Sequence, residues 1–234
     1  MAPRVLLLDN TLHPRLFILA KRWGRPLRGV AVDVVHAPSS RALPDVGGYT
    51  HLILTGSEAS ILAPAPWMER EARAVREAAA GGVRVLGSCF GHQMLVYALA
   101  GRRFLGRSAR QEVGWTPIEI LADDELLRGL PNPWTVFSFH FDEVVTPLPP
   151  PWRVLARTRD CAAQILRWGD SPVWGIQAHP EILRATAELA TRVVLLAARH
   201  RGGMPRAALR RPRDGQVFFD LVSRFLGGEA GRSG

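Results

Sequence analysis

The chain has 234 residues, of which 47% are hydrophobic and 22% are charged, a balance typical of a folded globular domain. No apolar run approaches the twenty residues that a transmembrane helix needs, and two cysteines are too few for a disulfide-stabilised scaffold. The formal net charge of +9 raises a nucleic-acid partner as a possibility, and the distribution of the basic residues, described below, argues against it.

Apolar stretches typical of strands alternate with helical patterns along the chain. The sequence predicts strands at 5–8, 30–36, 51–54, 83–86, 115–120, 135–141, 152–156, 163–168 and 173–177. It predicts helices at 14–22, 68–80, 93–100, 185–199 and 216–226. Alternation of this kind indicates an α/β fold with a mostly parallel central sheet and helices on both faces. The later strands, which have no helices between them, indicate an antiparallel addition.

No internal repeat or low-complexity linker divides the chain. The proline-rich run at 147–151 is typical of a stiff surface connection rather than of a domain boundary. We therefore expect a single domain at residues 1–226, followed by a flexible tail at 227–234.

The segment around Cys89 carries the strongest chemical signal. A short apolar strand runs into Gly87-Ser88-Cys89-Phe90-Gly91, and a helical pattern starts at once. A strand, tight turn and helix in this order expose a thiol above the edge of a sheet. The helix start favours the thiolate and offers backbone N–H groups to an oxyanion. For this residue alone, a small core cysteine is the alternative interpretation.

His179 and Glu181 follow the last predicted strand. Pro180 favours an extended conformation at His179, and alternate residues of an extended chain face the same side. An imidazole can take the proton of a thiol, and a carboxylate can orient the imidazole. Taken singly, these residues could be a structural histidine and a carboxylate at a helix N-terminus. Together with Cys89 they fit the roles of nucleophile, base and orienting acid.

The two segments together resemble the class I, triad-type glutamine amidotransferase family. The resemblance lies in Gly-x-Cys-x-Gly-x-Gln at 87–93 and His-Pro-Glu at 179–181, and it covers the chain from about residue 5 to about residue 188. It implies a flavodoxin-like sheet of that family's type. It also implies that Cys89 forms a γ-glutamyl thioester from glutamine, with His179 as base and acid and Glu181 as its carboxylate partner.

The resemblance assigns further residues around the triad. The backbone N–H groups of Gly56 and Phe90 would form the oxyanion hole. The positions that it assigns to the substrate are Ser57, Gln93, Phe139, His140, Phe141 and Asp142. Polar side chains near a helix start or a strand end are the alternative for Gln93, His140 and Asp142. Many members have Gly-Gly-Pro at residues 55–57 and glycine at 141, and the bulk of Phe141 leaves the identity of the substrate open.

The resemblance implies no cofactor, and no cysteine–histidine cluster has the spacing of a zinc site. Because this chain has no nucleotide-binding glycine-rich loop, ammonia released from glutamine would serve a separate synthetase partner. A stand-alone γ-glutamyl peptidase or amide hydrolase is the main alternative. Further alternatives are an acyltransferase on the same scaffold and a non-catalytic regulatory subunit.

The basic residues are scattered arginines except for a cluster at 199–213. No aromatic residues interleave with this cluster, as single-strand binding requires, so a solvated loop is the preferred interpretation and an acidic partner the alternative. We expect neither a nucleic-acid nor a membrane partner. The N-terminus lacks a signal-peptide pattern, and a catalytic cysteine must stay reduced, so we expect a cytoplasmic protein.

Overall fold

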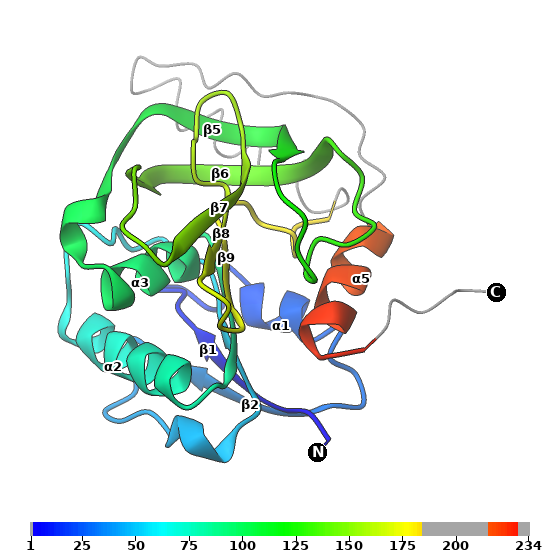
Figure 1. Ribbon diagram of the computed structural model, residues 1–234. Coiled ribbons are helices and arrows are strands. Elements are labelled where there is room, and N and C mark those ends of the chain that lie inside the picture. The colour runs from blue at the N-terminus through cyan, green and yellow to red at the C-terminus, as the bar shows by residue number, and fades with distance from the viewer. Residues whose placement is uncertain (1, 184–214, 229–234) are drawn as a thin grey trace.

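A nine-stranded mixed sheet with the order β2-β1-β3-β4-β9-β8-β7-β5-β6 forms the centre of the fold. The computed structural model describes residues 2–183 and 215–228 (Figure 1). The strands are β1 Arg4–Asp9, β2 Ala31–His36, β3 His51–Leu54, β4 Arg84–Ser88, β5 Leu105–Ile120, β6 Trp134–Val144, β7 Trp152–Arg157, β8 Ile165–Trp168 and β9 Val173–Ile176. The helices are α1 Leu19–Trp23, α2 Pro66–Ala80, α3 Phe90–Leu99 and α5 Gly215–Phe225, with short 3-10 turns η1 Val46–Gly48 and η2 Arg102–Phe104.

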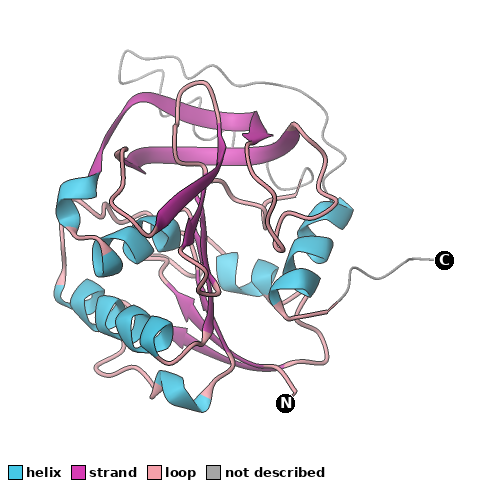
Figure 2. Ribbon diagram, in the orientation of Figure 1, coloured by secondary structure: helices cyan, strands magenta, loops and turns pink. Residues whose placement is uncertain are grey.

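The parallel part of the sheet comprises β2, β1, β3, β4 and β9. Its inner strands are apolar on both faces because helices cover both sides: α2 and α3 lie on one face, and α1 and α5 lie on the other (Figures 1 and 2). Alternate residues of β1 show this division. Leu6 and Leu8 belong to the core cluster under α2 and α3, whereas Val5 and Leu7 belong to the cluster with Trp23 and Phe218.

The strands β8, β7, β5 and β6 join the sheet through antiparallel pairs. This corrects the expectation of a flavodoxin-like sheet, because the observed sheet is mixed and curls, with β5 and β6 running across one end of the molecule (Figure 1). The physical reason is the connectivity: these strands follow one another without crossover helices, and short connections favour antiparallel neighbours.

Most predicted elements are present, with boundaries shifted by a few residues. Strand β5 begins ten residues before the predicted 115–120, because the polar segment 105–114 pairs with β6 despite its lack of an apolar pattern. The predicted helix at 14–22 is confined to α1, since residues 13–17 form a turn in which the N–H groups of Leu16 and Phe17 both bond to the carbonyl of His13. The predicted helix at 185–199, the basic cluster and residues 229–234 of the predicted tail lie outside the described residues.

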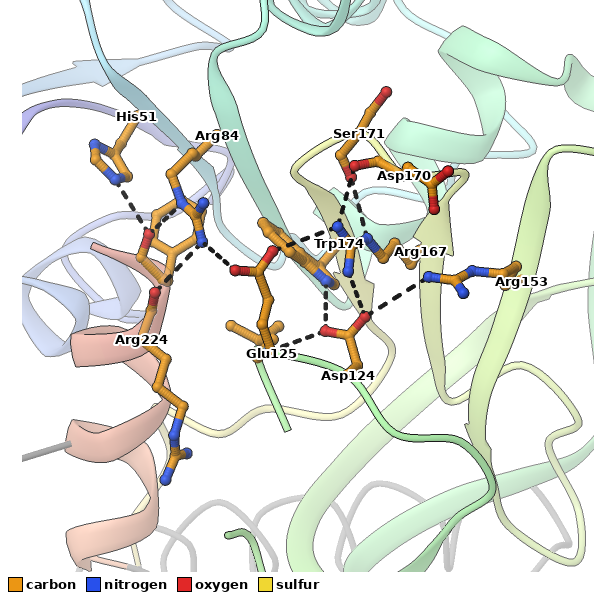
Figure 3. A network of polar contacts seen from close by, with 12 residues as sticks. His51, Arg84, Asp124, Glu125, Arg153, Arg167, Asp170, Ser171, Trp174 and Arg224 are labelled. Carbon is orange, nitrogen blue, oxygen red and sulfur yellow. Dashed lines mark hydrogen bonds and ion pairs between the residues drawn. The ribbon is translucent and has the colours of Figure 1, made fainter. Parts of the chain in front are cut away.

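A polar network connects the N-terminal end of β4 to the neighbouring elements (Figure 3). The carboxylate of Asp124 is fully buried and accepts hydrogen bonds from Arg167 Nη1 at 2.8 Å and Trp174 Nε1 at 3.0 Å. The guanidinium groups of Arg84 and Arg167 each lie 5.0 Å from the Trp174 ring centroid. Arg84 also donates to the Phe225 carbonyl at 2.7 Å. The network therefore anchors both β4 and the end of α5.

Replacement of Asp124 by alanine should lower the free energy of unfolding by about 3 kcal/mol, because it leaves the mostly buried Arg167 without its main partner. The matched control is Arg157→Ala, which removes an ion pair with Glu119 that is more than half exposed and should cost less than about 1 kcal/mol. Urea unfolding measures both. Equal shifts of the midpoint in the two variants would contradict this role for Asp124.

Candidate active site

Cys89 lies at the apex of a tight turn between β4 and α3. Its φ of 50° and ψ of −103° make it the single non-glycine residue with positive φ in the described parts of the chain, a strained conformation typical of functional turns. The turn closes only because glycines flank it. A Cβ at Gly87 would lie 2.5 Å from the Gly91 carbonyl carbon, and one at Gly91 would lie 2.4 Å from the Leu54 oxygen.

The sulfur of Cys89 is almost enclosed, with 6% of the residue exposed. Its Sγ lies 3.7 Å from the Phe139 carbonyl oxygen, and Gln177 Nε2 donates to it across 3.9 Å. The sulfur lies close enough to His179 to raise the pKa of that imidazole. The turn therefore presents the sulfur to groups from β6 and from the chain that follows β9.

The histidine that meets Cys89 is oriented by a carboxylate. His179 Nδ1 lies 2.8 Å from Glu181 Oε1, and Ser88 Oγ donates to Glu181 Oε2 at 3.2 Å. With Nδ1 bound in this way, Nε2 is the nitrogen left to face the sulfur. Burial lowers the pKa of His179, but the negative charges of Cys89 and Glu181 raise it by more, so the pKa lies well above the usual 6.5. The structure thus brings Cys89, His179 and Glu181 together, and their catalytic roles stay a prediction.

Gly56 lies against the imidazole, directly after β3. A Cβ at this position would lie 2.7 Å from His179 Cε1, so a side chain here would displace the base. The N–H of Gly91 bonds to the Thr55 carbonyl at 3.2 Å, which joins this turn to the start of α3. Phe90 is the first residue of that helix, where backbone N–H groups have no intrahelical acceptor. Gly56 thus lies beside the imidazole and Phe90 directly follows Cys89, and their role as oxyanion donors stays a prediction.

The residues predicted to face the substrate fall into two groups. Gln93 and Asp142 meet each other, because Gln93 Nε2 donates to the Asp142 carbonyl at 2.8 Å. Phe139 contacts the sulfur through its carbonyl, and its ring packs edge-on against the ring of Phe141, with centroids 5.3 Å apart.

The other two predicted side chains are engaged elsewhere. Ser57 Oγ accepts the Ala59 N–H at 3.0 Å, which is a contact within its own turn. His140 is buried and places Nε2 2.9 Å from Glu112 Oε2, so this edge of the ring faces β5 rather than the sulfur. Among the described residues, no hydrogen bond joins His140 to Cys89.

Three residues near the site were not predicted. Gln177 donates to the sulfur and accepts from Gln93 Nε2 at 3.2 Å. Its position two residues before His179 on an extended chain was an available signal. Arg107 Nη1 lies 2.8 Å from Asp142 Oδ1, and Ser60 Oγ donates to Asp142 Oδ2 at 2.5 Å. No local pattern marks these two, since the fold alone brings them to Asp142.

A second buried cluster lies beside the site. Glu112, His140 and Cys161 place potential ligand atoms within 4.8 Å of one another. The Glu112 carboxylate is already filled, however, by donors from His140, Thr158 and Gln164. Burial and the charge of Glu112 both raise the pKa of the Cys161 thiol. The chemistry of this cluster is therefore that of a hydrogen-bonded core network.

Within residues 2–183 and 215–228, no helix combines the length and apolar character needed to cross a membrane.

The sequence matches a known protein family over most of its length. The family model of the class-I glutamine amidotransferases covers residues 25–190, which is more than half of the chain. A glutamine-hydrolyzing GMP synthase subunit from Pyrococcus abyssi is 39% identical over 100 residues, covering 43% of this chain and 52% of the relative. The corresponding subunit from Methanothermobacter thermautotrophicus is 32% identical over 143 residues, covering 61% of this chain and 75% of the relative. The chain thus spans about half the length of the first relative.

Solved structures show the same fold. A glutamine amidotransferase from Thermotoga maritima superposes with a TM-score of 0.75 at 20% identity, covering 97% of this chain and 96% of its own. A glutamine amido transferase from Methylobacillus flagellatus gives a TM-score of 0.75 at 22% identity, covering 100% and 97%. The family match covers both the turn at Cys89 and the segment 179–181. Together with this match, these findings show that the chain belongs to the glutamine amidotransferase class-I family.

Proposed function

We propose that this protein hydrolyses the side-chain amide of glutamine through a γ-glutamyl thioester on Cys89 and releases ammonia. The observation that carries the proposal is the strained turn that holds the Cys89 thiol against the imidazole of His179, whose other nitrogen is bound by Glu181. A nucleophile, a base and an orienting acid in contact are the arrangement that activates a thiol for acyl transfer.

The steps follow from the groups. The Cys89 thiolate attacks the amide carbon, and the carbonyl electrons move to the oxygen, where the N–H groups of Gly56 and Phe90 stabilise the charge. The imidazolium of His179 gives its proton to the departing nitrogen, which leaves as ammonia. A water molecule then gives a proton to His179 and attacks the thioester, and collapse of this second intermediate releases glutamate and restores the thiolate.

The nitrogen acceptor is inferred from the relatives. The sequence relatives are named as subunits or forms of GMP synthase, so we propose that ammonia passes to a separate synthetase partner. One observation favours stand-alone hydrolysis of γ-glutamyl compounds as a second candidate: Phe141, beside Asp142, is 38% exposed, so an apolar group on the amide nitrogen could pack against it. Release of ammonia from glutamine that increases when a synthetase is added favours the first candidate. Faster turnover of γ-glutamyl anilides without a partner favours the second.

Asp142 and Arg107 form a charged pair suited to an amino-acid head group. The Asp142 carboxylate is buried, and its Oδ1 lies 2.8 Å from Arg107 Nη1 without an aligned hydrogen bond. The Arg107 side chain is 66% exposed. Asp142 follows Phe139, whose carbonyl contacts the sulfur, by three residues on β6, and its own carbonyl accepts a hydrogen bond from Gln93 of α3. We propose that Asp142 binds the α-ammonium group and Arg107 the α-carboxylate.

Replacement of Arg107 by alanine should lower kcat/KM for L-glutamine by about tenfold to a hundredfold, the value of one charge-assisted contact. The same change should not lower kcat/KM for 4-aminobutanamide, which lacks the carboxylate. The matched control is Arg103→Ala, another exposed arginine, which lies over the Phe104 ring instead. Equal losses on both substrates would contradict the assignment of Arg107, whereas a wild-type protein inactive on every γ-amide would contradict the proposed reaction itself.

A further inference from the structure

A buried carboxyl group with one partner lies behind the turn that carries Gly56. Glu71 of α2 is fully buried, and its Oε1 accepts a hydrogen bond from Asn10 Nδ2 at 2.8 Å. Its Oε2 has no hydrogen-bond partner among the described residues. Placing an acid in the core costs free energy, and nothing in the proposed reaction uses this group. A role for Glu71 must therefore act through Asn10.

Asn10, at the end of β1, holds the turn by two hydrogen bonds. Its backbone N–H bonds to Thr55 Oγ1 at 2.9 Å, and its side-chain Nδ2 bonds to the Thr55 carbonyl at 3.2 Å. The Gly91 N–H bonds to the same carbonyl. Because Asn10 Nδ2 has two hydrogens, one serves Thr55 and the other serves Glu71. Glu71 thereby fixes the rotation of the Asn10 amide.

The Thr55 carbonyl and the Gly56 N–H belong to one peptide unit. A peptide unit is planar and trans, so its carbonyl and its N–H point in opposite directions. Two donors that hold the carbonyl toward Asn10 and α3 therefore hold the N–H away from them. Gly56 lies against His179, so this peptide unit borders the site, and its N–H faces away from Asn10 and α3.

We propose that Asn10 and Glu71 are positioning residues that aim the Gly56 N–H at the oxyanion, an inference that rests on the proposed glutamine hydrolysis. An oxyanion donor lowers the barrier only when it is already oriented. Loss of the pair should therefore slow the chemical step and leave substrate binding almost unchanged. Burial raises the pKa of Glu71 to about 8, so the group is neutral near pH 7 and glutamine is its closest replacement. The carboxylate of the adjacent Asp9 accepts hydrogen bonds from the N–H and the hydroxyl of Thr11, and so it is directed to Thr11 rather than to Glu71.

The test compares Asn10→Ala, Glu71→Ala and Glu71→Gln with Glu77→Ala, an exposed acid on the same helix. Ammonia release from glutamine gives kcat and KM, and iodoacetamide gives the alkylation rate of Cys89, which needs no oxyanion donor. We expect kcat to fall about tenfold to a hundredfold in Asn10→Ala and Glu71→Ala. This loss is somewhat smaller than the loss expected when an oxyanion donor itself is removed. KM and the alkylation rate should stay within about threefold, and Glu71→Gln and Glu77→Ala should retain kcat.

Two outcomes would overturn the inference. One is an unchanged kcat in Asn10→Ala. The other is a joint fall of kcat, alkylation rate and melting temperature, including in Glu71→Gln, which indicates a structural role alone. Failure of the proposed reaction is distinguishable from both, because the wild-type protein would then release no ammonia from glutamine while its Cys89 is still alkylated.

Discussion

Cys89→Ala should lower the rate of ammonia release from glutamine by about three orders of magnitude or more, because removal of a covalent nucleophile is rarely tolerated. No other described thiol can substitute for it, since Cys161 is buried in the network of Glu112. The side chain lost is small and the turn conformation is retained, so the fold should persist. Steady-state release of ammonia, measured with a coupled dehydrogenase assay, gives the rate.

The second cysteine provides the matched control for this experiment. Cys161→Ala removes a thiol of the same size from a site that the reaction does not use, and it should keep kcat within about threefold. Trapping gives an independent readout: glutamine added to the wild-type protein and quenched in acid should leave a γ-glutamyl mass adduct that Cys89→Ala lacks. Equal rates in wild type and Cys89→Ala would refute the thioester mechanism.

Glu181→Gln should reduce kcat by about two to four orders of magnitude, the range seen when the carboxylate of a catalytic triad is neutralised. The replacement has the same shape, and the hydrogen bond to His179 Nδ1 can persist, so the loss reports the missing charge. That charge helps to raise the pKa of His179. Without it the imidazolium loses its proton at lower pH, so the alkaline limb of the kcat/KM profile should move to lower pH.

The control for Glu181 is the neighbouring hydroxyl. Ser88→Ala removes the hydroxyl that donates to the same carboxylate and leaves the negative charge in place. It should therefore cost less than Glu181→Gln, about tenfold to a hundredfold for one hydrogen bond to a charged acceptor. A Glu181→Gln variant with wild-type kcat and an unmoved alkaline limb would show that His179 needs no carboxylate.

The parts of the site that depend on local sequence were predictable. The tight turn at Cys89 requires small residues on both sides, and Gly87 and Gly91 supply them within five residues of chain. His179 and Glu181 are two residues apart after a buried strand, so their shared direction follows from the alternation of an extended chain. The order of apolar strands and helices likewise indicated the α/β class and the parallel part of the sheet.

The parts that depend on distant pairing were not predictable. The register of β5 against β6 shifts between Arg107 and Glu112, and this irregularity has no marker in the polar sequence around it. The shift decides that Arg107 meets Asp142 and that Glu112 meets His140. Glu71 illustrates the same limit, since an acid on an amphipathic helix is normally taken as part of its charged face, whereas here it lies in the core.

The backbone bridge between Phe137 and His179 has a mechanical consequence. The His179 N–H bonds to the Phe137 carbonyl at 2.7 Å, and the two residues form an isolated antiparallel pair. This link fixes the backbone of His179 to β6. A change that distorts β6 at Phe137 should therefore displace the imidazole relative to Cys89.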